Sequence, residues 1–136
     1  MRHIAIACGA LLLLAGCATL EQKDKLREQT LDNYAAALRW GDFASAWSFV
    51  DPAVRAAHPP SPAEQARYDS VRVAEYDTQG PQQTGENTVE QTAHIRLIVK
   101  ASQTAYDIVD HQTWRWDPQA KRWWLESGLP DIAPRN

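Results

Sequence analysis

The chain has 136 residues, which suits one domain with a sizeable hydrophobic core. Its formal net charge is −3, from 14 basic and 17 acidic side chains, and this balance argues against an electrostatic nucleic-acid binder. Its only cysteines, Cys8 and Cys17, both lie near the N-terminus.

The first 16 residues have the three parts of an export signal. A cationic start at Arg2 is followed by an apolar run over residues 4–14 and then by small residues up to Cys17. A membrane-spanning helix needs about 20 apolar residues, so this run is too short to be a lasting anchor. We therefore expect residues 1–16 to be removed, and the loss of Arg2 changes the net charge from −3 to −4.

The sequence Leu14-Ala15-Gly16-Cys17 resembles the lipobox of bacterial lipoproteins. The resemblance implies a diacylglycerol on Cys17 and usually a further acyl chain, and stable anchoring in a lipid bilayer takes more than one chain. Ala18 rather than aspartate follows the cysteine, which in enteric-type bacteria favours the periplasmic side of the outer membrane. The alternative is an ordinary signal peptide with a chance cysteine.

Removal of Cys8 and acylation of Cys17 would leave no thiol for a disulfide, so the folded part must be held by packing alone. We expect residues 17–25 to be the acylated cysteine and a short polar tether, residues 26–128 to form one α+β domain, and residues 129–136 to be a C-terminal tail. A mildly acidic surface gains nothing from anionic lipid.

Helical spacing dominates the first half of this domain. One apolar face predicts a helix over residues 21–40, and a second face predicts a helix from Phe43 to Val50, with Gly41 and Asp42 between them as helix end and N-cap. Asp51 is expected to cap one further turn after Pro52. The spacing of a capping box at Ser61 then predicts a short helix that ends near residue 68.

From residue 71 the apolar pattern changes to period two, which predicts strands. We expect strands over residues 71–77, 89–100, 104–116 and 122–126, and a mobile loop over residues 79–87. The result is an α+β fold in which N-terminal helices pack on a curved antiparallel sheet of about four strands.

This order of helices and strands, with residues 34–42 ending in Ala-Leu-x-x-Gly-Asp, resembles the nuclear transport factor 2-like superfamily with its cone-like, cystatin-like α+β fold. The resemblance covers residues 26–128. The segment between the helices and the first strand is short for that family, which would shrink or open the pocket. Such folds include ketosteroid isomerases and non-catalytic binding domains, so fold does not decide function.

Asp110 is the candidate for pocket chemistry. Pairing apolar with apolar residues sets Leu97 opposite Ile108, Ile95 opposite Asp110 and Gln91 opposite Trp114, so that Asp110 and Gln112 face inward. A buried carboxyl raises its own pKa, and the neighbours that could hydrogen-bond to it are Tyr34, Tyr68 and Tyr76. The alternative is a β-bulge that flips the strand, or a place for Asp110 at the open rim of the sheet.

The same register sets His94 opposite His111 and Glu90 opposite Arg115 on the outer face. Zinc usually needs three or four protein ligands, so the histidines are interpreted as a solvated pair and no metal site is predicted. Trp40 and Trp124 are the tryptophans with the best chance of exposure, and both are candidates for ligand binding, although Trp124 could instead stack on Arg115. No cofactor motif is found.

The sequence therefore predicts a membrane-anchored cell-envelope lipoprotein with a non-catalytic binding or assembly domain. Its expected partners are the bilayer, through the acyl anchor, and an envelope protein or a small ligand. The alternative is a small-molecule enzyme or carrier of the ketosteroid isomerase-like type that uses Asp110 in a pocket.

Overall fold

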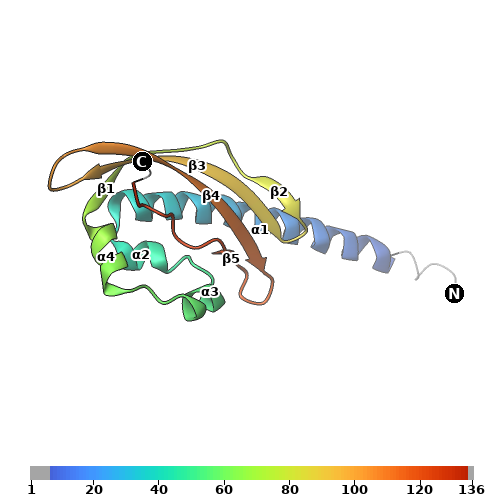
Figure 1. Ribbon diagram of the computed structural model, residues 1–136. Helices are drawn as coiled ribbons and strands as arrows, with labels where there is room; N and C mark the ends of the chain where they lie inside the picture. The colour runs from blue at the N-terminus through green and yellow to red at the C-terminus, as the bar shows by residue number, and fades with distance from the viewer. Residues whose placement is uncertain (1–6, 135–136) are drawn as a thin grey trace, which may run out of the picture.

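In the computed structural model, which describes residues 7–134, four helices precede five strands (Figure 1). The fold is α+β, with the N-terminal helices packed on a curled antiparallel sheet, which confirms the predicted class. Residues 1–6 of the predicted signal peptide lie outside the described residues, as do the side chains before residue 19. Within the described part of the chain, no helix is long and apolar enough to cross a membrane.

Helix α1 (Ala7–Trp40) is longer than the helix predicted over residues 21–40. Its C-terminal half lies against the concave face of the sheet, whereas its N-terminal half projects beyond the last strand (Figure 1). The predicted contact face is confirmed, because Tyr34 is fully buried and Leu31 and Leu38 pack against the same core.

The segment predicted as a tether is helical, and its C-terminal part is attached to the domain. Lys23 Nζ donates hydrogen bonds to Glu86 O at 2.8 Å and to Asn87 Oδ1 at 3.0 Å. Trp123 Nε1 donates to Lys23 O at 3.1 Å. Lys23, six residues after Cys17, is therefore held against the sheet.

Helix α2 (Phe43–Trp47) begins at the predicted N-cap, since Ser45 N donates to Asp42 Oδ1 at 2.8 Å. It ends before Val50 because residues 49–51 pair with the last strand instead. Leu125 N donates to Phe49 O at 2.8 Å, and Asp51 N donates to Leu125 O at 3.0 Å. This pairing protects the free edge of the sheet.

Helices α3 (Pro52–Ala57) and α4 (Pro62–Asp69) carry the caps that the sequence predicts. Asp51 accepts from Ala53 N, and Ser61 forms a complete capping box with Glu64. Asp51 also pairs with Arg115, whose Nη2 lies 2.5 Å from Asp51 Oδ2. Burial raises the pKa of Asp51, but the bonds from Arg115 and Ala53 outweigh it and hold the pKa below its usual value.

The sheet has the order β1-β3-β4-β5, with β2 paired to β3. Its strands are β1 (Val71–Thr78), β2 (Gln82–Gly85), β3 (Thr88–Val99), β4 (Ala105–Asp117) and β5 (Arg122–Leu125). The prediction of a loop over residues 79–87 was wrong in part. Strand β2 is exposed throughout and shows no apolar alternation, so its backbone pairing with β3 has no signal in the sequence.

The predicted β3–β4 register was wrong by two residues. Ile95 lies opposite Ile108, Leu97 opposite Tyr106 and Gln91 opposite Gln112. The hairpin closes between Val99 and Thr104 around Gln103, which adopts a left-handed φ of 56°. A two-residue slip keeps each side chain on its own face, so the predicted inward row is unchanged.

Strand β1 contains a bulge at Ala74, which has no partner on β3. The extra residue shifts the alternation, so that Val73 and Tyr76 both face inward, opposite Leu97 and Ile95. The bulge therefore brings a tyrosine hydroxyl into the interior that strict alternation would have turned outward.

Two apolar clusters fill the interior. One joins α1 to the β5 end of the sheet, and its buried members are Tyr34, Val50, Val89, Trp114, Trp123 and Leu125. The other lies at the β1 end, and its buried members are Ala93, Ile95, Leu97, Ile108 and Ile132. Because Ile132 is in this set, the segment predicted as a C-terminal tail contributes to the core.

Candidate functional site

Asp110 projects from β4 into the interior, as the alternation predicts. Its exposed fraction is 9%, and its partner across β3 is Ala93 rather than Ile95. Strands β3 and β4 pair without a bulge, and the carboxyl is buried. The alternatives of a flipped strand and of a place at the open rim therefore do not apply.

The side-chain amide of Gln112 lies at the centre of a buried polar cluster. Its Nε2 donates to Asp110 Oδ2 and to Tyr76 Oη, both at 2.9 Å. Its Oε1 accepts from Gln91 Nε2 at 2.8 Å and from Trp114 Nε1 at 3.2 Å. An amide has two donor hydrogens and two acceptor positions, so every hydrogen bond that Gln112 can make is made.

The three tyrosines that were predicted as neighbours of Asp110 differ in their bonding. Tyr76 is joined to Asp110 through Gln112, and burial is the main reason that its pKa rises to about 12. Tyr68 donates to Pro130 O instead. Tyr34 is fully buried, and among the residues that the structure describes its hydroxyl has no hydrogen-bond partner. Burial and then the charge of Asp110 raise the pKa of Tyr34 well above its usual value.

Burial also raises the pKa of Asp110 itself, and this effect outweighs the bond from Gln112 and the neighbouring charge of His111. A carboxyl that is hard to ionise can donate a hydrogen bond or accept a proton at unusual pH. The cluster therefore has the chemistry of an acid–base site, provided that a ligand can reach it.

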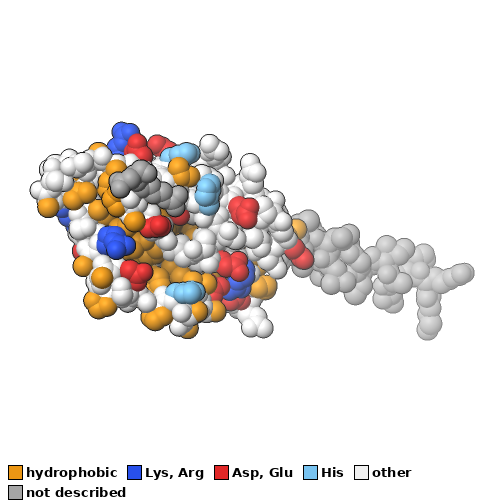
Figure 2. Space-filling view, viewed as in Figure 1, with side chains coloured by type: hydrophobic (Ala, Val, Ile, Leu, Met, Phe, Trp, Pro, Cys, Tyr) orange, Lys and Arg blue, Asp and Glu red, His pale blue; other side chains and the backbone are white. Residues whose placement is uncertain are grey.

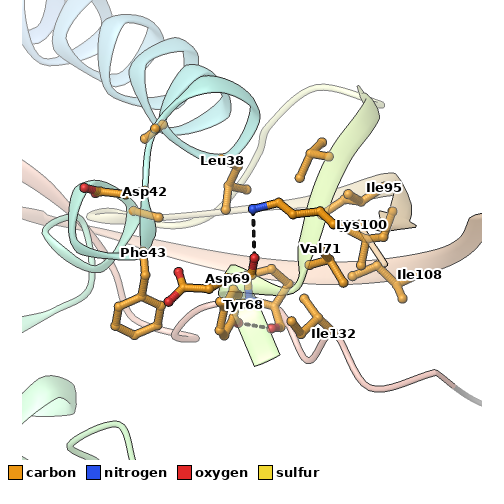
Figure 3. Close-up of a pocket in the computed structure, with 16 residues that line it drawn as sticks. Leu38, Asp42, Phe43, Tyr68, Asp69, Val71, Ile95, Lys100, Ile108 and Ile132 are labelled. Carbon is orange, nitrogen blue, oxygen red and sulfur yellow. Dashed lines mark hydrogen bonds between the residues drawn. The ribbon is translucent and has the colours of Figure 1, made fainter. Parts of the chain in front are cut away.

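The curled sheet and the helices on its concave face form a cone-like body, whose open end near α2 and α4 holds two hollows that share Tyr68 in their lining. These two hollows together are called the mouth. The first hollow has a volume of about 180 Å³ and lies between the end of α1, helices α2 and α4, and the sheet. Figure 3 shows Phe43 and Tyr68 on one side of it and Val71, Ile108 and Ile132 on the other. Lys100 closes one side, and its Nζ donates to Asp69 O at 2.8 Å.

The second hollow has a volume of about 330 Å³, and it shares Phe43, Tyr68, Pro130 and Ile132 with the first. Its outer wall adds Trp47, which stacks on Phe43 with ring centroids 5.7 Å apart, and Val54. Figure 2 shows hydrophobic side chains gathered on this side of the molecule, away from the projecting part of α1. The mouth could not be predicted from the sequence, because its walls come from separate segments of the chain.

Neither Asp110 nor Tyr34 lines these two hollows. The first hollow reaches the Ile95–Ile108 pair, and Ala93–Asp110 is the next inward-facing pair along the strands, about 7 Å further in. Ile132 packs in the same cluster as Ala93 and Ile108. The acid is therefore separated from the mouth by packed apolar side chains.

The two candidate tryptophans are not brought to this site. Trp40 has an exposed fraction of 80% at the end of α1, where it contacts Arg39. Trp124 lies under Arg122, whose guanidinium is 4.1 Å from the ring centroid, rather than on Arg115 as one prediction had it. Neither lines the hollows described above.

The slip in register also separates the two histidines, so their predicted pairing was wrong. His94 lies opposite Val109, and His111 lies opposite Thr92. Arg115 is opposite Thr88 rather than Glu90 and pairs with Asp51. Among the described residues, no group of three or more histidine, cysteine or acidic side chains is arranged to hold a metal ion.

Comparison with known proteins adds no assignment. No protein-family model matches the chain, and no curated protein is significantly similar to it. The function must therefore be argued from the residues themselves.

The buried carboxyl makes stability depend on pH. Because the pKa of Asp110 is higher in the folded than in the unfolded chain, the folded state holds the proton more tightly, and stability falls as pH rises from about 4 through the folded pKa. Asp110→Asn imitates the protonated acid. We expect this variant to exceed the wild type in free energy of unfolding at pH 7, and to match it near pH 3.

Urea unfolding of both proteins at pH 3, 5 and 7 measures this difference. A difference that stayed constant across the three pH values would show that Asp110 does not change its affinity for the proton on folding.

Proposed function

We propose that the protein is a membrane-anchored cell-envelope lipoprotein whose domain binds a partner at the open end of the cone. The proposed anchor is a lipid on Cys17, supported by the sequence Leu14-Ala15-Gly16-Cys17 and by the export signal before it. The residue after it, Ala18, favours an anchor in the outer membrane, with the domain on the periplasmic side. Binding is proposed as non-catalytic.

The observation that carries the binding proposal is the contrast between the two parts of the interior. Asp110 lines neither hollow and lies behind packed apolar side chains, whereas the side chains around Tyr68, mainly aromatic and aliphatic, face two adjoining hollows. Apolar concave sites with a few polar groups are the usual form of ligand and partner sites. The hollows therefore favour recognition at the mouth over chemistry at the acid.

The long helix supports an outward-facing mouth. From Cys17 to Trp40 the helical rise is about 35 Å, and α2 and α4 lie near the far end of α1 (Figure 1). Residues of both helices line the hollows. An anchor at Cys17 would thus hold the mouth away from the bilayer, where an envelope partner could reach it.

A second candidate function is a small-molecule enzyme or carrier of the ketosteroid isomerase-like type. The raised pKa of Asp110 favours it, as does the hydroxyl of Tyr34, which is unpartnered within the described part of the chain, since both groups could hydrogen-bond to a polar ligand atom. An enzyme of this type would need substrate access to Asp110, and Asp110→Asn would abolish its turnover. If the domain only binds a partner at the mouth, Asp110→Asn would still bind that partner.

The anchor is tested by Cys17→Ser in cells fed labelled palmitate. The wild type is expected to incorporate label and to sediment with outer membranes, whereas the variant loses both because serine offers no thiol for the thioether. Cys8→Ser is the matched control and should behave as the wild type. Label retained by Cys17→Ser would refute the assigned site.

The mouth is tested by placing one charge in the second hollow and one on the opposite face. Val54→Glu should abolish cross-links between the anchored protein and its envelope partner, because it replaces an apolar wall residue with a carboxylate that must be desolvated when the partner binds. Val109→Glu is the control, since Val109 has an exposed fraction of 50% on β4. Equal cross-linking by both variants, each shown to be folded by circular dichroism, would place the partner elsewhere.

A further inference from the structure

The last described residues, 129–134, form a strap that crosses the mouth of the cone. The strap contains no helix or strand, and it runs from the end of β5 back toward β1 (Figure 1). It follows Gly128, which has a φ of +77° and so turns the chain in a way that other residues rarely adopt.

The strap is held in the way that a receptor holds a peptide. Two tyrosine hydroxyls of the domain donate to its backbone carbonyls: Tyr68 to Pro130 O, and Tyr106 to Ile132 O at 2.6 Å. In the described part of the chain these are the hydrogen bonds that join strap to domain. Because the acceptors are backbone carbonyls, these two hydrogen bonds do not depend on which side chains the strap carries.

The side chains of the strap alternate in burial. Pro130 and Ile132 are buried, Asp131 between them is exposed, and Asp131 Oδ1 accepts from Ala133 N within the strap itself. Carbonyls bound at every second residue, with apolar side chains buried at those residues, are the pattern of a peptide segment recognised from one side.

The strap does not fill the space that it crosses. Pro130 and Ile132 line both hollows, so unfilled volumes of about 180 and 330 Å³ remain on either side of Tyr68. Larger apolar side chains at these two positions would fill more of this space and bury more apolar area. The mouth therefore has room for a peptide with larger apolar side chains than those of the strap.

We propose that the mouth is a receptor for an apolar-x-apolar peptide segment of another envelope protein, and that the strap occupies this receptor in cis. The inference rests on the proposed binding function and names its partner class. The partner's two carbonyls take the hydroxyls of Tyr68 and Tyr106, and its apolar side chains replace Pro130 and Ile132. The tethered strap competes at an effective concentration in the millimolar range, so it weakens binding until it is displaced.

The test uses the full acylated chain in phospholipid nanodiscs and a labelled peptide with the sequence of residues 128–136, Gly-Leu-Pro-Asp-Ile-Ala-Pro-Arg-Asn. Ile132→Asp releases the strap, and fluorescence anisotropy should show that this variant binds the peptide at least tenfold more tightly than the wild type. Val109→Asp is the control and should bind as the wild type does. Adding Tyr68→Phe and Tyr106→Phe to the released variant should weaken binding severalfold.

A peptide with aspartate in place of its isoleucine should not bind. A folded Ile132→Asp variant that binds the original peptide no better than the wild type would overturn the proposal.

If Ile132→Asp does not fold, the wild type supplies the measurement. In a chain with labelled isoleucine methyl groups, peptide at millimolar concentration should displace part of the strap and move the Ile132 methyl signal toward its random-coil position, and an unmoved signal would overturn the inference. Loss of partner cross-links in Val54→Glu does not depend on the peptide. A failed peptide test beside a successful cross-linking test therefore rejects the strap mechanism and leaves the binding function standing.

Discussion

The interior of this domain depends on the side-chain amide of Gln112. It holds Asp110, Tyr76, Gln91 and Trp114 by four hydrogen bonds inside a layer that is otherwise apolar. Each partner left unpaired in such a layer would cost free energy, so the polar residues on β3 and β4 are tolerated together or not at all. This constraint also fixes the Gln91–Gln112 pairing, and with it the register of the two longest strands.

The fold could be predicted from the sequence where local rules decide it. The caps at Asp42, Asp51 and Ser61 lie within a few residues of the groups that they bind, and the inward face of β4 follows from strand alternation. The register could not be predicted, because a slip of two residues preserves the alternation and the choice depends on the side-chain bonds of the Gln112 cluster, which strand alternation does not indicate. Strand β2 was missed because its exposed residues pair only through the backbone.

The candidate site could also be predicted only in part. The burial of Asp110 follows from its parity with the apolar residues of β4, but its isolation from the hollows depends on Ile132, which comes from a segment that had been expected to be a tail. The mouth is assembled from Phe43, Tyr68 and the strap, which are far apart in the chain. The same strap that seals the acid also lines the hollows, so closure of the interior and recognition at the mouth are coupled in this account.

The most direct measurement of the central claim is the free energy of unfolding of Gln112→Leu at pH 7. Leucine keeps the volume but removes all four bonds, and the account predicts a loss of about 3 kcal/mol or more because several buried polar groups lose their partner at once. Gln82→Leu on exposed strand β2 is the control and should change little. A Gln112→Leu variant as stable as the wild type would contradict the claim that this amide holds the interior together.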